Sequence, residues 1–159
     1  EISAAQLAQT AFVTGTTGDS LQIRAFDGYD WSAGDSAAWS PFNVAVTSYT
    51  APTLTTADKS ATPNQSFTLS SLISVTDTDG DTMTRYQLWD SSREAGSGHW
   101  VVNGVAQAAG TVIDITAAQL TQTSFLDGTL GDSLQVRAFD GISWTAADNA
   151  PWAPFHIGA

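Results

Sequence analysis

The sequence predicts an all-β protein composed of antiparallel β-sandwich repeats, and three observations lead to this fold class. Short runs of strand-forming residues alternate with turn residues at about the spacing that a sandwich requires. Residues 2–44 recur almost unchanged, without insertion or deletion, as residues 115–157. Within residues 133–139, and again within residues 20–26, aliphatic side chains alternate with others, so each strand has one aliphatic face.

The repeat unit has the size of a whole domain. Aligning Ile2 with Ile115 gives an offset of 115 − 2 = 113 residues, far more than the roughly 20 to 50 residues of a solenoid turn. Each unit should therefore have its own core. Because residue 1 corresponds to residue 114, residues 1–45 are predicted to be the C-terminal half of a preceding repeat in a longer protein.

The domain boundaries follow from the phase of this repeat. Residues 46–61 are rich in Thr, Ser, Ala and Pro, and they are predicted to form the inter-repeat junction and the first edge strand. Residues 62–159 are the remainder of one complete repeat of about 49–158. The alternative, a unit at 1–113, would place the proline-containing linker inside a domain. The half-repeat exposes strand edges, so we expect neighbouring repeats or chains of the same protein to complete it.

The complete repeat contains candidate strands, most of them four to seven residues long. They are Ser66–Ser70, Leu72–Thr76, Met83–Trp89, His99–Val102, Val105–Ala108, Thr111–Ile115, Ser124–Leu126, Ser133–Phe139 and Trp152–Ile157. Asn103 and Gly104 tolerate the positive φ of a type I′ turn and predict a hairpin. One helical turn is expected at Thr116–Leu120, capped by Asp114 or Thr116 and mirrored by Ser3–Leu7, where it would cross between the sheets.

Composition limits the partners of the chain. The formal net charge of −11 argues against nucleic acid and anionic membranes, whereas it suits a cation or a solvated extracellular surface. The absence of cysteine rules out disulfides and thiolate metal sites. No stretch approaches the roughly 20 apolar residues of a membrane span, so no membrane insertion is expected.

The acidic turn, residues 77–81, is the main candidate metal site. Asp77, Asp79 and Asp81 alternate around Gly80, which lets the backbone fold tightly so that the carboxylates can converge on a calcium ion. No Glu occupies the twelfth position and no helices flank the segment, which excludes an EF-hand. The alternative is a plain polar turn between strands.

Asp140 is a second candidate ligand. It precedes Gly141 after a predicted strand, and Asp27 mirrors it in the half-repeat. In a seven-strand sandwich this loop would lie at the same end as the acidic turn and the incoming linker, where a cation could stiffen the junction. The alternative is that Asp140 only forms a turn. Asp132 and Asp19 are predicted to be local turn caps.

Tryptophan is abundant, with six residues: Trp31 and Trp39, which recur as Trp144 and Trp152, and also Trp89 and Trp100. Rings that recur at fixed positions favour a core role, and an exposed platform for sugar rings is the alternative. Arg24 and Arg137 occupy equivalent strand positions, so we expect each to form a salt bridge or stack on a tryptophan. No catalytic, phosphate-loop or zinc motif is present, which predicts that the chain is not an enzyme.

A set of motifs extends over the complete repeat: residues 77–81, 86–90, 98–104, 115–120, 132–141 and 144–155. Together they resemble the Ig-like or cadherin-like repeats of large bacterial RTX-type, type I secreted surface proteins and adhesins. The likeness also covers residues 2–44. No glycine-rich nonapeptide run is present, so the export route follows from the resemblance alone.

The resemblance implies an extracellular, cell-surface repeat that acts as a spacer or adhesive element. It implies calcium at Asp77, Asp79, Asp81 and Asp140, where the ion would stiffen the junction. The expected function is that of a structural repeat in a long adhesin or filament-forming protein. The alternative is a carbohydrate-binding β-sandwich module that binds cell-surface glycans through exposed tryptophans.

Overall fold

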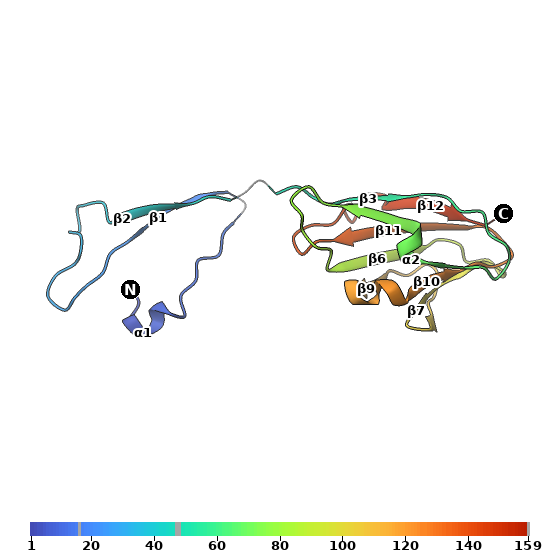
Figure 1. The fold of residues 1–159 in the computed structure, drawn as a ribbon, viewed down its shortest axis with the longest axis horizontal. Helices are drawn as coiled ribbons and strands as arrows, with labels where there is room; N and C mark the ends of the chain where they lie inside the picture. The colour runs from blue at the N-terminus through green and yellow to red at the C-terminus, as the bar shows by residue number, and fades with distance from the viewer. Residues whose placement is uncertain (16, 47–48, 159) are drawn as a thin grey trace. The chain divides into compact units, whose positions relative to one another are not determined.

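The computed structural model describes residues 1–15, 17–46 and 49–158, which form two compact units that divide between Tyr49 and Thr50. Both consist of antiparallel strands with a few short helices, so the all-β prediction is confirmed (Figure 1). Residues 16, 47, 48 and 159 lie outside the described residues. Residue 16 falls in the predicted half-repeat, residues 47 and 48 in the predicted junction, and residue 159 in the remainder of the complete repeat. None of the helices in the described part has the length and apolar character needed to cross a bilayer.

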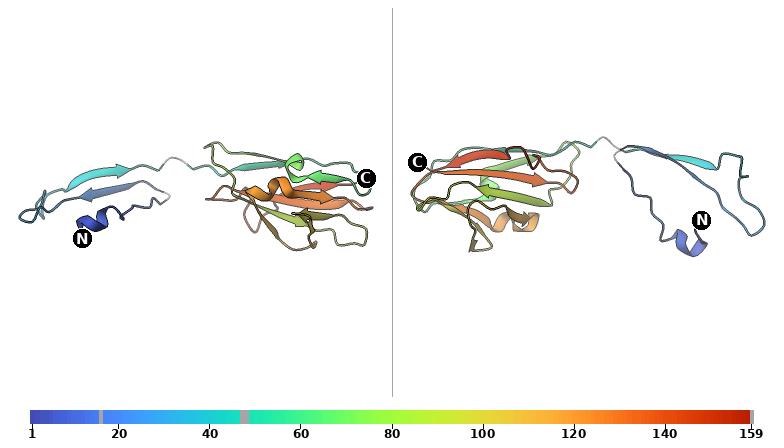
Figure 2. Two further views of the ribbon diagram at one scale, coloured as in Figure 1. Left: turned by 60° about the horizontal axis from the view of Figure 1, so that its bottom comes forward. Right: turned by 180° about the vertical axis from the view of Figure 1, so that it is seen from behind.

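The second unit contains two four-stranded antiparallel sheets within the described residues, seen from two sides in Figure 2. One has the order β4 (Ser66–Thr68), β10 (Thr123–Leu126), β7 (His99–Val102) and β8 (Val105–Ala106). The other has the order β12 (Ala153–Ile157), β11 (Asp132–Phe139), β6 (Arg85–Asp90) and β9 (Ile113–Thr116). A further pair joins β3 (Thr53–Thr56) to β5 (Ile73–Thr76).

Side chains from both sheets share one core. On β11, Leu134, Val136 and Ala138 are buried at alternate positions, as the sequence pattern predicts. From the other sheet, Trp100 packs edge-on against Phe125 with ring centroids 5.2 Å apart. The buried members are Leu69, Leu72, Tyr86, Leu88, Trp100, Val102, Ile113, Ile115, Phe125, Leu134, Val136, Ala138, Phe155 and Ile157.

The segment that opens the second unit, from β3 to Lys59, pairs first with β5 and then with β12. Strand β3 lies where the sequence predicts a first edge strand, and it pairs with β5. A few residues later the backbone N–H of Lys59 donates to the His156 carbonyl at 2.9 Å, within a parallel bridge between Lys59 and Ile157. The segment therefore covers part of the open edge of β12.

The helices differ from the prediction in one respect. Helix η1 (Ala117–Gln122) forms at the predicted place, with Thr116 as its N-cap, and α1 (Ala4–Leu7) begins after Ser3. The predicted strands Ser66–Ser70 and Leu72–Thr76 are wrong where they meet, because α2 (Leu69–Leu72) separates β4 from β5. Its two leucines are three residues apart and both buried, so one helical turn brings both side chains into the core.

The other predicted strands are present, with ends within two residues of those expected. The hairpin between β7 and β8 is also confirmed. Asn103 and Gly104 both have positive φ, 51° and 79°, and Val102 pairs with Val105 across the turn.

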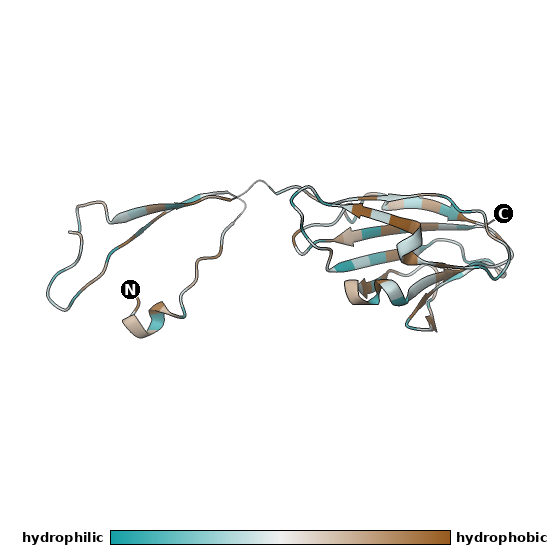
Figure 3. Cartoon of the chain, in the orientation of Figure 1, coloured by the Kyte–Doolittle hydropathy of each residue, from teal (hydrophilic) through white to brown (hydrophobic). Residues whose placement is uncertain are grey.

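Within the described residues, the first unit contains α1 and one antiparallel pair, β1 (Asp19–Ile23) with β2 (Ser40–Val44). The pairing of Leu21 with Phe42 repeats that of Leu134 with Phe155. Figure 3 shows apolar residues along the strands of both units. However, none of the described residues 1–15, 17–46 and 49 is buried. The first unit thus has the local structure of the second without its core.

Candidate metal site

The acidic turn lies between β5 and β6 and is held by its own first residue. The Oδ1 atom of Asp77 accepts hydrogen bonds from the backbone N–H groups of Asp79 at 2.8 Å and Asp81 at 3.1 Å. Gly80 has a φ of +84°, which glycine adopts without strain. As a result, one carboxylate oxygen from each of the three aspartates lies within 4.8 Å of the others.

These ligands suit a hard cation that prefers oxygen. Asp77 is half-buried, whereas Asp79 and Asp81 are exposed to solvent. The Oδ2 atom of Asp77 is buried and has no hydrogen-bond donor among the residues that the structure describes. Asp79 uses its Oδ2 atom to accept the backbone N–H of Thr50 at 2.6 Å. The first residue of the second unit is therefore tied to the candidate metal ligands.

Asp140 lies at the same end of the unit but serves a turn of its own. Phe139 pairs with Arg85 at the start of β6, so the residue after β11 lies close to the loop before β6. The buried Asp140 accepts the backbone N–H groups of Ile142 at 2.7 Å and Ser143 at 2.8 Å through Oδ1. The carboxylates that converge are those of the acidic turn, without Asp140. Metal binding by Asp140 stays a prediction.

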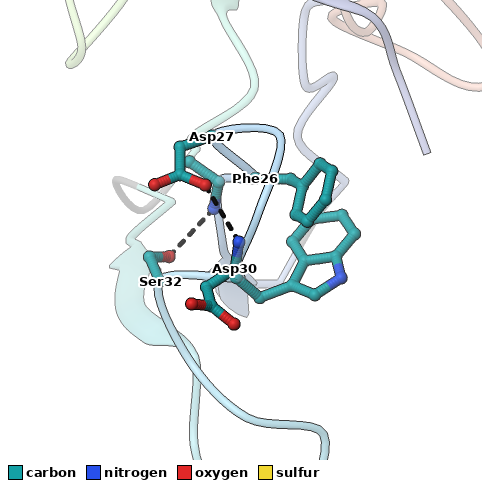
Figure 4. Close-up of a pocket in the computed structure, with 6 residues that line it drawn as sticks. Phe26, Asp27, Asp30 and Ser32 are labelled. Atoms are coloured by element: carbon teal, nitrogen blue, oxygen red, sulfur yellow. Dashed lines mark hydrogen bonds between the residues drawn. The ribbon is translucent and has the colours of Figure 1, made fainter.

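The equivalent turn in the first unit has the same geometry (Figure 4). Asp27 accepts the N–H groups of Asp30 at 2.9 Å and Tyr29 at 2.8 Å, and these bonds hold the pKa of Asp27 below its usual range. The Phe26 and Trp31 rings lie 5.1 Å apart. Since this unit has no buried described residue, the turn forms from local contacts alone.

Arg137 forms both contacts that the sequence predicts. Its buried guanidinium lies between Trp144 and Trp152, 4.4 Å from each ring centroid. It also forms an ion pair with Asp148 at 2.5 Å and donates to Gln87 and a backbone carbonyl. Arg24 has equivalent contacts with two tryptophans and an aspartate. The cluster of one arginine between two tryptophans is therefore part of the repeat.

Three of the tryptophans of the complete repeat bear on sugar binding. Trp152 is buried against Arg137 and Trp100 lies within the core, so neither indole forms an exposed platform. Trp89 is partly exposed and lines a shallow hollow of about 280 Å³ together with Trp152, Gln135 and Asp148. This hollow is the place where the carbohydrate alternative could apply.

Sequence reasoning missed a group of buried carboxylates at the other end of the unit. Asp132, predicted to be a local turn cap, instead accepts the N–H of Gly98 from another loop at 2.9 Å, so that prediction is wrong. Asp90 and Asp127 are also buried. Burial raises the pKa of Asp90 to about 6, and it raises the pKa values of Asp127 and Asp132 as well. In the sequence, only their positions at the ends of strands distinguish these three aspartates from the other acidic residues.

Comparisons with protein-family models, curated proteins and solved structures find no match for the chain.

Proposed function

We propose that the chain is a structural repeat of a long extracellular protein, an adhesin or filament at the cell surface, in which it acts as a spacer. The observation that carries the proposal is the duplication of structural contacts. The arginine–tryptophan cluster, the paired strands and the Asp-Gly turn all recur at an offset of 113 residues. The contacts that recur in both copies are ones that stabilise a fold. Each added copy of such a fold makes the protein longer and extends its reach.

The strand order supports an Ig-like or cadherin-like sandwich. Strands β12, β11 and β6 adjoin in the way that strands G, F and C do in an Ig-like sheet, while β4, β10 and β7 correspond to B, E and D. The opening segment pairs first with β5 and then, in parallel, with the last strand.

We further propose that calcium binds the acidic turn and stiffens the start of the repeat. The support is the bond between Asp79 and the backbone of Thr50, together with the unsatisfied buried oxygen of Asp77. A cation there would neutralise three neighbouring carboxylates in a chain with a net charge of −11. It would also fix the loop that is bonded to Thr50, the residue at which the second unit begins.

Calcium added to chelator-treated protein should raise the melting temperature through this site, because a ligand that binds only the folded state stabilises it. The expected gain is about 2.7 kcal/mol at 100 times the Kd. Changing Asp79 and Asp81 together to asparagine should remove most of this gain. Calorimetry measures the stability, and NMR should show calcium-dependent shifts of the Thr50 and Asp81 amides.

The matched control for that experiment is Asp58→Asn. Asp58 accepts the N–H of His156 through Oδ1 at 2.8 Å, a bond that an asparagine oxygen can also accept, so the variant removes one charge without removing a contact. It should respond to calcium as the parent does. An unchanged melting temperature on chelation, with no amide shifts in the acidic turn, would reject calcium binding there.

The alternative is a carbohydrate-binding role for the hollow beside Trp89. Its indole, Gln135 and Asp148 combine an aromatic surface with polar groups, as sugar sites do. If this role holds, a glycan array should show binding that Trp89→Ala abolishes. Trp31→Ala, in the first unit, is the control and should leave binding intact. An array at background level for the parent chain rejects the alternative.

A further inference from the structure

The tip of the hairpin between β7 and β8 carries a reactive pair of residues. Asn103 directly precedes Gly104, whereas the other asparagines, Asn43, Asn64 and Asn149, are followed by residues with a side chain. In an Asn-Gly pair the backbone nitrogen of the glycine can attack the side-chain carbonyl carbon of the asparagine, because no Cβ atom hinders its approach. Asn103 is therefore the asparagine of this chain whose following residue leaves that path open.

The reacting groups of this turn are accessible to water. Asn103 and Gly104 are both exposed, and the turn is held by the backbone N–H of Asn103, which donates to the Gln122 carbonyl at 3.0 Å. Neither the N–H of Gly104 nor the side-chain amide of Asn103 has a hydrogen-bond partner among the described residues. A Cβ atom on Gly104 would meet nothing within 4 Å. No hydrogen bond has to break before the nucleophile and the amide react.

We propose that Asn103 is a site of spontaneous deamidation in the folded chain. Hydroxide removes the amide proton of Gly104, and the nitrogen forms a bond to Cγ of Asn103. The bond from Cγ to the side-chain nitrogen then breaks, and that nitrogen takes up a proton and leaves as ammonia. Water opens the resulting succinimide ring at either carbonyl and gives aspartate or isoaspartate. The reaction consumes water, involves no oxidation or reduction, and does not depend on the proposed spacer function.

The two products affect the hairpin differently. Aspartate keeps the backbone of the turn and, like asparagine, is common before glycine in type I′ turns. Isoaspartate instead continues the chain through its side chain, which adds a backbone atom between Val102 and Val105. These residues pair across the turn, so the added atom breaks their register. Strand β8 is short and exposed at the sheet edge, whereas β7 also pairs with β10 and buries Trp100. Isoaspartate therefore releases β8 and leaves the core in place.

The test incubates the full chain at physiological temperature, at mildly acidic and mildly alkaline pH, and then unfolds it for digestion with trypsin. Cleavage after the basic residues places each asparagine in a fragment of its own: 25–59, 60–85, 94–137 and 138–159. Fragment 94–137 should gain the mass difference between an amide and an acid, faster at alkaline pH, and should become a substrate for isoaspartyl methyltransferase. The other three fragments are internal controls and should stay unchanged.

Two variants separate the chemistry from its structural effect. Asn103→Gln keeps an uncharged amide but would have to close a larger ring, so it should lose the mass gain. Asn103→Asp has the charge of the product on an unaltered backbone. The amide of Gln107, which donates to the Trp100 carbonyl at 2.8 Å, reports on the hairpin. It should be protected from hydrogen exchange in the parent and in freshly prepared Asn103→Asp, and should lose protection in the isoaspartate fraction.

Three results would overturn the proposal. If fragment 94–137 gains acid only when the chain is incubated in urea, the folded turn protects Asn103. A mass gain that persists in Asn103→Gln would place the reaction at a glutamine of the same fragment. An isoaspartate fraction in which the Gln107 amide keeps its protection would mean that the hairpin tolerates the longer backbone.

Discussion

Replacing Arg137 with alanine is expected to lower the free energy of unfolding of the second unit by about 2 kcal/mol or more, because the buried side chain loses its contacts with two tryptophans. The guanidinium fills the space between two indole rings, each 4.4 Å away, where a desolvated cation–π contact contributes about 2 kcal/mol. Its loss also leaves Gln87 and the Ala146 carbonyl without their donor. Urea unfolding monitored by tryptophan fluorescence measures the change.

The matched control is Arg85→Ala. Arg85 also pairs with an aspartate, Asp114, but both side chains are at least 40% exposed, so its loss should cost no more than about 1 kcal/mol. Arg137→Lys should recover little of the stability, because an ammonium group cannot stack flat between two rings. Equal effects for Arg137→Ala and Arg85→Ala would contradict the structural role of the cluster.

The sequence was most informative where contacts are local or repeated. The alternation at Leu134, Val136 and Ala138 predicted a buried strand face, and Asn103-Gly104 predicted the hairpin because positive φ is a property of the residues themselves. The recurrence of arginine and tryptophan at one offset predicted their contact, since two copies are expected to retain a shared interaction.

The sequence was least informative where distant segments decide the outcome. The segment Leu69–Leu72, with two leucines around two serines, is too short for its pattern to distinguish a strand from a helical turn, and only the core into which both leucines point selects the helix. Asp132 follows a glycine and precedes a serine, which is typical of a turn cap. Its bond to Gly98, 34 residues away, could not be predicted from local pattern.

The second prediction concerns the apolar side chains of the first unit that are exposed to solvent, which together form its open face. Phe12, Ile23 and Phe42 are 49%, 52% and 48% exposed, whereas their counterparts in the second unit, at an offset of 113 residues, are at most 2% exposed. We propose that a segment with the sequence type of residues 50–113 covers this face, because those residues supply the strands that the first unit lacks. Full burial of each large apolar side chain contributes about 1.5–3 kcal/mol.

A chain with a second copy of residues 50–113 placed directly before Glu1 should therefore contain two complete units. The phase is continuous, since residue 113 precedes the counterpart of residue 1. Amides of β1 and β2 should become protected from hydrogen exchange, and the urea m-value should rise because more surface is buried on folding. The control carries Leu88→Asp in the added copy only, which disrupts the new core and should leave β1 and β2 unprotected.

Comparing the extended and unextended chains also distinguishes completion of the first unit from self-association of two chains. A second copy of the unextended chain already uses its residues 50–113 for its own core, so it can cover the open face only by exchanging strands, and protection would then depend on concentration. In the extended chain the covering strands are linked to the face, so protection should be independent of concentration. Protection of residues 1–44 in the unextended monomer would instead mean that the first unit is closed by itself, and the proposed completion would be wrong.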